Sequence, residues 1–401
     1  MWLDRFPKGR RPAYPRFRGE IDADVVIVGG GLTGSACAAS FAAAGVSVAL
    51  LEGDRIGSGS TAASPGLIRQ DFDASFQDTA NTHGLRAARV LWQGLRRASL
   101  DFAAALRRYD IKCDLAPQDL LHVVRRDPDA LKRLRREYDA RRAAGLDHTW
   151  MNASAVSREA SIEAGAAIRT RGFVFDPFRA CLGLAQSAAG RGALLFEHSP
   201  VRRVRTRKKH VEVVTAAGSV RAQAVVIATS APLADLRALR RHLHHHESYA
   251  VVTEPLPAAV RRELGKRAAA MRDGSSPPHF LRWLKEDRAL FIGADHEPAG
   301  ARARDKTLVQ RSGQLMYELS TIYPAISGAM PEWSWEVAHD STSDGLPYIG
   351  LHRNFPRHLF ALGHARHGAA VAWLAARLLL RLFQDAPEKG DEFFGFSRIL
   401  K

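Results

Sequence analysis

The stretch DVVIVGGGLTG, residues 24–34, decides the fold of this 401-residue chain. Residues 24–28 are rich in β-branched side chains and predict a buried strand. A glycine-rich turn follows, then an alanine-rich segment that predicts a helix ending before Gly45. A second apolar strand over residues 46–51 leads directly to Glu52. The order strand, glycine loop, helix, strand and acid is the one that a dinucleotide-binding fold requires.

The small residues of the turn have separate geometric roles in such a fold. Gly29 makes the tight turn, Gly31 lets the backbone approach a pyrophosphate, and Gly34 lets the helix pack on the strand. The helix begins near Leu32 and Thr33, where unpaired N–H groups and the positive end of the helix dipole attract phosphates. The acid after the second strand is placed to accept hydrogen bonds from ribose hydroxyls, and it disfavours NADP by repelling a 2′-phosphate.

The segment RIGSGSTAASPG, residues 55–66, bears on the choice between a flavin and a nicotinamide. A chain that passes close to a bulky flavin needs small side chains and accessible N–H groups. A catalytic NAD domain normally continues directly into its next strand and helix. The run therefore favours FAD, with a plain surface loop as the alternative. Its candidate cofactor contacts are Gly59, Ser60, Thr61 and Ala62.

The composition is that of a folded protein large enough for two compact regions, with 46% hydrophobic and 25% charged residues. Three cysteines give no disulfide framework and favour a reducing, cytoplasmic location. The longest apolar run, residues 368–383, contains two arginines and falls short of the roughly 20 apolar residues that span a bilayer. The net charge of +16 keeps a peripheral membrane contact open, while the lack of a basic stripe makes nucleic acid an unlikely partner.

The rest of the chain predicts an α/β protein whose two regions interleave in sequence. Residues 83–146 have the periodicity of two or three amphipathic helices. Short strands are expected in the middle of the chain, and a final strand and helix at its end. Parallel strand–helix–strand order at the start and antiparallel pieces in the middle indicate two regions. The predicted strands are 194–196, 201–214, 224–229, 249–253, 279–284, 289–292 and 358–362; the predicted helices are 179–189, 308–323 and a last one from about residue 368.

The chain resembles the D-amino acid oxidase superfamily of flavoenzymes, which includes glycine oxidase, sarcosine oxidase and D-amino acid dehydrogenase. The resemblance rests on the glycine fingerprint, the small-residue loop, DGLPYIG at residues 344–350 and GHARHG at residues 363–368. It implies a Rossmann-type FAD-binding domain that is discontinuous in sequence, together with an α+β substrate domain built on an antiparallel sheet. The implied boundaries are 20–85, 165–245 and 336–401 for the FAD-binding domain, and 86–164 and 246–335 for the substrate domain.

The resemblance also implies a reaction, the oxidation of a C–N bond of an amine or amino acid. In such enzymes a hydride passes to flavin N5, and the resulting imine hydrolyses. Oxygen, a quinone or a carrier protein then takes the electrons. Two alternatives keep the flavin fold: an enzyme that acts on a modified base in tRNA, and a flavin subunit of a larger dehydrogenase complex.

Further flavin contacts follow from the resemblance. The last helix is similar to one whose N-terminus faces the pyrimidine edge of the flavin, where its dipole stabilises negative charge. The expected contacts are Gly363, His364, Gly368 and Ala369, with Val201 against the adenine. His364 and His367 are catalytic candidates because a histidine near the substrate nitrogen helps to keep the amine unprotonated. A purely structural hydrogen bond to the backbone is the alternative for both histidines.

The sequence departs from the family at two positions. Many members that act on amino acids carry an arginine five residues before the Asp-Gly of the 344–350 motif, and here that residue is His339. Either the substrate is not a simple α-amino acid, or another cation binds its carboxylate. Arg69 matches the position of a substrate arginine in sarcosine-oxidase-like members, so it is the first candidate for that cation, with His339 second; a surface charge is the alternative for Arg69. Val337 stands where a cysteine tethers the flavin in those members, which predicts noncovalent FAD.

Two other clusters have simpler interpretations. Four histidines, His242 and His244–His246, lack the spacing of a metal site, so we expect no metal and a solvated loop. The basic run at residues 202–209 alternates with valines, which predicts the exposed side and tip of a hairpin rather than a binding surface for RNA or lipid.

Overall fold

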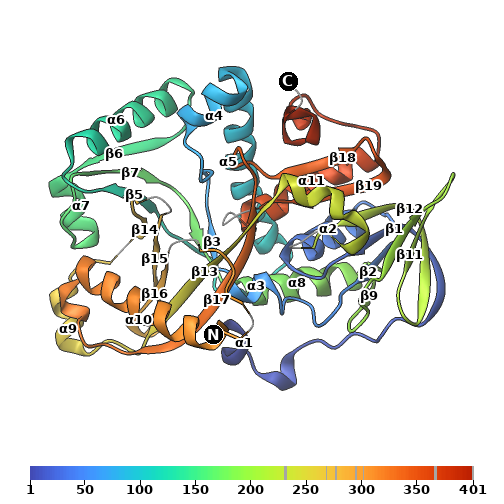
Figure 1. Ribbon diagram of the computed structural model, residues 1–401, viewed down its shortest axis with the longest axis horizontal. Coiled ribbons are helices and arrows are strands. Elements are labelled where there is room, and N and C mark those ends of the chain that lie inside the picture. The colour runs from blue at the N-terminus through green and yellow to red at the C-terminus, as the bar shows by residue number, and fades with distance from the viewer. Residues whose placement is uncertain are drawn as a thin grey trace.

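A computed structural model describes residues 1–229, 233–267, 269–275, 278–293, 296–300, 302–364 and 368–399. It is an α/β structure with two eight-stranded sheets and one three-stranded sheet (Figure 1). The first sheet lies on the right of the view and the second on the left. This arrangement confirms the predicted fold class.

The first sheet is built around the strand that opens the glycine fingerprint. The strand order is β10-β11-β12-β1-β2-β9, and β19 pairs with β12 and β18. The central pairs β1·β12, β1·β2, β2·β9 and β12·β19 are parallel, as a dinucleotide fold requires. The strands are β1 (Gly19–Val28), β2 (Val48–Leu51), β9 (Leu194–Phe196), β10 (Arg203–Thr206), β11 (Val211–Val214), β12 (Gly218–Ile227), β18 (Tyr348–His352) and β19 (Phe355–Leu362).

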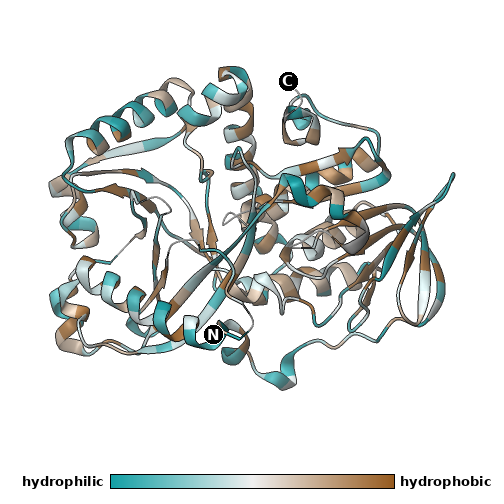
Figure 2. Ribbon diagram, viewed as in Figure 1, coloured by the Kyte–Doolittle hydropathy of each residue, from teal (hydrophilic) through white to brown (hydrophobic). Residues whose placement is uncertain are grey.

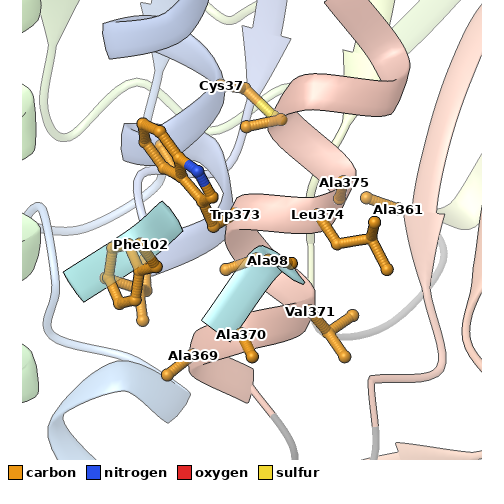
Figure 3. Close-up of a cluster of buried hydrophobic side chains, with 14 of the residues drawn as sticks. Cys37, Ala98, Phe102, Ala361, Ala369, Ala370, Val371, Trp373, Leu374 and Ala375 are labelled. Atoms are coloured by element: carbon orange, nitrogen blue, oxygen red, sulfur yellow. The ribbon is translucent and has the colours of Figure 1, made fainter. Parts of the chain in front are cut away.

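Helices packed against one another hold the last helix of the chain beside the glycine loop. Helix α11 (Gly368–Phe383) packs on α2 (Leu32–Ala43) and α5 (Leu85–Arg108), and α2 also contacts α8 (Pro177–Ala189). Small side chains on α11 permit this close approach, and Trp373 fills the remaining space against Phe102 with ring centroids 5.8 Å apart (Figure 3). The two helix N-termini nearest the predicted cofactor, those of α2 and α11, therefore share one core.

The second sheet is mostly antiparallel, in the order β17-β13-β16-β15-β14-β5-β7-β6. Only β14 and β5 pair in parallel among its described strands. Its strands are β5 (Leu120–Val124), β6 (His148–Asn152), β7 (Ala166–Thr170), β13 (His244–Thr253), β14 (Ala270–Arg272), β15 (Phe280–Leu284), β16 (Arg288–Ile292) and β17 (Pro331–Ser341). The three-stranded sheet has β3 (Leu67–Ile68), β8 (Phe173–Val174) and β4 (Ala116–Pro117).

The remaining helices lie mainly on the periphery. Helix α6 buries only Leu134, Glu137 and Arg141 and is largely hydrophilic (Figure 2). By contrast, strand β2 of the first sheet is apolar and fully buried, as are the last four residues of β1. Among the described residues, no helix combines the length and apolar character that crossing a membrane requires. The other helices are α1 (Trp2–Arg5), α3 (Ser60–Ala63), α4 (Phe76–His83), α6 (Pro128–Ala143), α7 (Ala153–Ala160), α9 (Ala258–Leu264) and α10 (Arg304–Ile322).

Several strands were not predicted, among them β6, β7, β14, β17 and β18, and two of the predictions are wrong. Residues 83–146 contain β4 and β5 as well as helices, because a short apolar run such as Leu120–Val124 forms a strand once a partner strand is available. His244–His246 begin β13 rather than forming a loop, since β17 pairs with them in register, with His246 opposite His339. The predicted exposed hairpin at 202–209 is confirmed by β10 and β11.

The strands are also shared out between the two sheets differently from the expected domain boundaries. Strand β7, within the expected FAD-binding segment 165–245, pairs with β5 and β6 in the second sheet. Strand β17 belongs to that sheet through residue 341, beyond the expected boundary at 336. Helix α5, in the expected substrate segment, packs on α11. Local periodicity identifies a strand or helix, but hairpin pairing and side-chain packing decide which sheet it joins. The domain division itself remains a prediction.

Candidate active site

A cavity of about 450 Å³ lies between the glycine loop of the first sheet and the strands β13 and β17 of the second sheet. It brings together segments that are more than 300 residues apart in the sequence. The predicted site residues that line it are Gly29, Gly31, Leu32, Thr33, Glu52, Gly59, Ser60, Thr61, Arg69, His339, Gly363, His364 and Gly368. Gly34, Ala62, Val201 and Ala369 are not among its lining residues, and His367 lies outside the described residues.

The glycine loop is shaped by two close backbone approaches. Gly29 has φ +104°, and a Cβ there would lie 2.8 Å from the carbonyl oxygen of Ala228. A Cβ on Gly34 would overlap the carbonyl oxygen of Gly29, so this glycine lets α2 pack directly on the end of β1. Gly34 thus has a packing role behind the cavity rather than in its wall.

Glu52 is oriented by two backbone groups at the end of β2. Its Oε2 accepts a hydrogen bond from the Gly30 N–H at 2.6 Å, and its Oε1 accepts one from the Asp54 N–H at 2.8 Å. Each carboxylate oxygen can accept further hydrogen bonds. The acid therefore presents a fixed, negatively charged edge to the cavity, which suits a ribose and disfavours a 2′-phosphate.

The small-residue loop is hydrogen-bonded to the start of α2 on one side and to two tryptophan side chains on the other. Thr61 Oγ1 accepts a hydrogen bond from the Leu32 N–H at 2.8 Å, which joins the start of α2 to α3. The Trp2 indole N–H donates to the carbonyl of Ser64 at 2.8 Å, and the Trp335 indole N–H donates to the carbonyl of Ala63 at 3.1 Å. The loop is therefore held in place by large side chains at its back.

Arg282 also holds the end of the small-residue loop by hydrogen bonds. Its Nη1 donates to the carbonyl oxygens of Pro65, Gly66 and Phe175 at 2.8, 2.8 and 2.9 Å. Burial lowers the pKa of the Arg282 guanidinium to about 10, and the side chain lies over the Trp2 ring with 5.4 Å between the guanidinium carbon and the ring centroid. The sequence did not point to Trp2 or Arg282, because their partners are backbone carbonyl groups, which every residue has.

Arg69 stands in the wall of the cavity, 4% exposed, with its guanidinium over the ring of Phe280. Its Nε and Nη1 donate to carboxylate oxygens of Asp71 and Asp73, each at 3.1 Å. Burial opposes the charged form, but the two carboxylates outweigh it and raise the pKa of Arg69 above its ordinary value. Within the described part of the chain, the buried Nη2 has no hydrogen-bond partner.

Two of the candidate histidines, His364 and His339, lie within the described residues, and each has a neighbour at hydrogen-bond distance. His364 Nδ1 lies 3.3 Å from Thr33 Oγ1, which connects the end of β19 to the start of α2. His339 Nδ1 lies 3.3 Å from the carbonyl oxygen of Val337, and its ring lies beside that of His246 with centroids 5.6 Å apart. Both histidines line the cavity.

Sequence reasoning missed about half of the lining. Asp54, Gly57 and Ser58 are close in sequence to predicted residues and could have been included on that ground. Ser64 and Pro65 also belong to the small-residue loop 55–66. The others lie on or directly after strands that the tertiary fold brings to the cavity, and of these the sequence had drawn attention to Val337 only as the position of a flavin tether. They are Leu67, Ala228, Thr229, Ser248, Phe280, Ile292, Val337, Ala338, Asp340, Ala361 and Leu362.

A glycine loop at the end of β1, a fixed acid at the end of β2 and a cavity walled by a second sheet are the features of the site of a dinucleotide-dependent oxidoreductase. The chain belongs to the DAO family of FAD dependent oxidoreductases, whose family model matches residues 24–382. The predicted family and the FAD cofactor are thereby confirmed, and the close backbone approaches at Gly29 and Gly34 are those that an FAD cradle needs.

Similar proteins cover almost the whole chain. The chain is 26% identical over 386 residues to probable oxidoreductase OrdL of Haemophilus influenzae, covering 94% of this chain and 86% of the relative. It is 26% identical over 378 residues to gamma-glutamylputrescine oxidoreductase of Escherichia coli, covering 93% and 86%. The structure of glycine oxidase from Geobacillus kaustophilus superposes with a TM-score of 0.76 at 23% identity, covering 94% of this chain and 99% of that one.

Proposed function

We propose that this FAD-dependent oxidoreductase oxidises the C–N bond of a small amine or amino acid that carries a carboxylate. The observation that carries the proposal is the Arg69 guanidinium, which is buried in the cavity wall with its Nη2 lacking a partner among the described residues. A charged donor in this state strongly favours an anionic acceptor. The names of the relatives, glycine oxidase and gamma-glutamylputrescine oxidoreductase, support an amino compound as substrate.

The cradle residues would hold FAD in an orientation set by the two loops. The N-terminus of α2 and the glycine loop would receive the pyrophosphate, and Glu52 the ribose hydroxyls. Bound FAD supplies the two-electron acceptor for the C–N bond. The N-terminus of α11, beginning at Gly368, would favour negative charge at the edge of the cofactor.

The chain's own residues then orient the substrate and handle its proton. Arg69 binds the carboxylate and so fixes the direction in which the amine points. His364, which lines the cavity beside Thr33, accepts the proton that the substrate ammonium must lose before oxidation. His339 is the second candidate for contact with the carboxylate.

We further propose that FAD is held without a covalent bond. Val337, which lines the cavity, has no nucleophilic atom. The three cysteines, Cys37, Cys113 and Cys181, are all buried outside the cavity lining, and burial raises the pKa of each thiol to about 12. A protonated, buried thiol is a poor nucleophile.

An anaerobic screen tests the proposed function. The purified holoenzyme is mixed with amines and amino acids, with and without a carboxylate, and the loss of oxidised-flavin absorbance is followed. We expect bleaching by a carboxylate-bearing amine and recovery of the colour on adding oxygen, a quinone or another electron acceptor. Bleaching only by amines without a carboxylate would contradict the role of Arg69, and no bleaching by any amine would contradict the reaction class.

A further inference from the structure

A second cavity, of about 490 Å³, lies between strand β18 and the segment 387–397 near the end of the chain (Figure 1). None of the residues that line it lines the cavity of the candidate active site. Its volume falls within the range of roughly 300–1,000 Å³ that is usual for sites that bind small organic molecules. The side chains around it decide which class of molecule it suits.

Two histidines of this cavity are fixed so that each presents an N–H group. His352, on β18, is 9% exposed, and its Nδ1 accepts a hydrogen bond from the Asn354 N–H at 3.2 Å. His242 Nε2 accepts one from Arg241 Nε at 3.2 Å. Burial lowers the pKa of both rings and nearby arginines lower it further, so both are uncharged at neutral pH. An uncharged ring that accepts at one nitrogen carries its proton on the other.

The protonated nitrogens are therefore His352 Nε2 and His242 Nδ1. Within the described part of the chain, neither nitrogen has a hydrogen-bond partner, and both rings line the cavity. The two ring centroids are 6.3 Å apart, so the two donors are neighbours. Because buried polar groups are almost always hydrogen-bonded, the largely buried ring of His352 favours an acceptor atom in this cavity.

Arg241 and Arg353 add positive charge beside these donors. Both side chains are exposed and line the cavity, and neither pairs with a carboxylate of the described residues. The parts of the chain that carry them, residues 241–242 and 349–353, contribute no acid to the lining. This wall therefore presents two N–H donors and two guanidinium groups, which together favour an anion.

The acids of the lining all belong to the segment 387–397, and each has a partner there or on α11. Asp391 accepts a hydrogen bond from Arg381 Nε at 3.0 Å, and Glu392 accepts one from the Gly390 N–H at 2.7 Å. Glu388 Oε1 lies 3.8 Å from the same Arg381 Nε. These carboxylates are therefore directed to groups of their own segment and of α11 rather than to the wall formed by β18.

Apolar side chains make up much of the remaining lining. Leu351 is 53% exposed, whereas Phe396 is buried and stacks on Tyr348 with ring centroids 4.6 Å apart. Leu382 and Pro387 add further apolar surface. An exposed leucine beside a fixed aromatic ring gives an apolar molecule a surface to cover. The cavity thus combines an apolar part with a wall of donors and cations.

We propose that this cavity is a second binding site, separate from the active site, for an organic anion with an apolar body, such as an aromatic carboxylate. The anionic group accepts hydrogen bonds from His352 Nε2 and His242 Nδ1 and lies close to the guanidinium groups of Arg241 and Arg353. The apolar body covers Leu351 and the other apolar residues of the lining.

Calorimetric titration of the holoenzyme tests this site. The probe is 2-naphthoate, and 2-naphthamide serves as the uncharged probe of nearly the same shape. Arg69→Met is the background, so that the proposed carboxylate site in the first cavity does not contribute, and the flavin spectrum is followed in parallel. We expect one 2-naphthoate per chain, bound about tenfold more tightly than 2-naphthamide and without a change in the flavin spectrum.

Charge reversal at the two exposed arginines locates the site. Arg353→Glu and Arg241→Glu should each raise the Kd for 2-naphthoate about fivefold or more and change that for 2-naphthamide less than about twofold. Arg86→Glu, at an exposed residue of α5, makes the same change in net charge away from the cavity and should leave both Kd values unchanged. His352→Phe removes the buried donor and should also weaken 2-naphthoate binding, whereas His352→Gln keeps an N–H group and should lose less.

Three results would overturn the inference. The first is the absence of saturable 2-naphthoate binding, and the second is equal affinity for 2-naphthoate and 2-naphthamide. The third is binding that neither arginine variant weakens, or that alters the flavin spectrum, because such binding lies outside this cavity. Since both arginines are exposed, their variants decide the question even if a His352 variant does not fold. None of these results bears on the role of Arg69 in the proposed function.

Discussion

Glu52 Oε2 and the backbone N–H of Gly30 are 2.6 Å apart, so the acid at the end of β2 is tied directly to the glycine loop at the end of β1. The two parts of the nucleotide fingerprint therefore act as one unit in this enzyme. A substitution at Glu52 would therefore remove the proposed ribose acceptor and also loosen the loop that we propose receives the pyrophosphate.

Glu52→Ala should weaken FAD binding by about 1.5–3 kcal/mol, the contribution of a hydrogen bond to a charged group. The measurement is the Kd for FAD, obtained by titrating the apoprotein and following the quenching of flavin fluorescence. Glu52→Gln is the matched control: it keeps an acceptor oxygen and should lose less affinity. Equal affinity in Glu52→Ala and the unmodified enzyme would mean that the ribose is held by other residues.

Gly34→Ala should prevent normal packing of α2 on β1, because the added Cβ would overlap the carbonyl oxygen of Gly29. We expect a loss of thermal stability and little bound FAD. Gly313→Ala, in the interior of α10 where nothing lies within 4 Å, should instead stabilise the protein by roughly 0.5–1 kcal/mol through helix propensity. Similar melting temperatures and FAD contents for the two variants would refute the proposed packing role of Gly34.

Trp2→Phe should release FAD faster than the unmodified enzyme, because it keeps a ring over Arg282 but cannot donate to the carbonyl of Ser64. The lost hydrogen bond is worth about 0.5–1.5 kcal/mol, so the dissociation rate should rise by roughly two- to tenfold. Stopped-flow transfer of FAD to an excess of a flavin-binding acceptor protein measures the rate. Trp333→Phe provides a control on β17, and an identical rate in Trp2→Phe would show that α1 does not restrain the loop.

Acid precipitation should release all FAD into solution, since none of the three cysteines lines the cavity and Val337, which does line it, has no nucleophilic atom. The absorbance of the supernatant and of the dissolved pellet measures the two fractions. Flavin that stays with the precipitated chain would require a covalent bond to another residue.

The fingerprint could be predicted from sequence because its signals are local. The β-branched run before Gly29, the glycine spacing and the acid after β2 each follow from backbone geometry within about 30 residues. The strands Leu194–Phe196 and Phe355–Leu362 could be anticipated in the same way from their apolar runs.

The part of the cavity around Arg69 and strands β13 and β17 could be predicted only in part. Arg69 could be singled out by its position. Arg272, about 200 residues away, donates a hydrogen bond to the backbone carbonyl of Asp73, the ion-pair partner of Arg69, and no residue pattern reveals this contact. A loop is the prediction for His244–His246 because they lack the spacing of a metal site, yet pairing with β17 makes them part of a strand. The conformation of these histidines and the contacts around Arg69 therefore depend on strand pairing and long-range hydrogen bonds, which a local sequence pattern does not show.

The central claim is that Arg69 binds the carboxylate of an amine that reduces the flavin. The most direct measurement is the rate of anaerobic flavin reduction in Arg69→Met, compared with the unmodified enzyme and with Arg69→Lys, using the best substrate from the screen and its amide. We predict that Arg69→Met lowers the reduction rate divided by the substrate Kd about 10- to 100-fold for the carboxylate and less than threefold for the amide, with Arg69→Lys in between and FAD content unchanged. An equal loss for the carboxylate and the amide, or no loss for either, would contradict the claim.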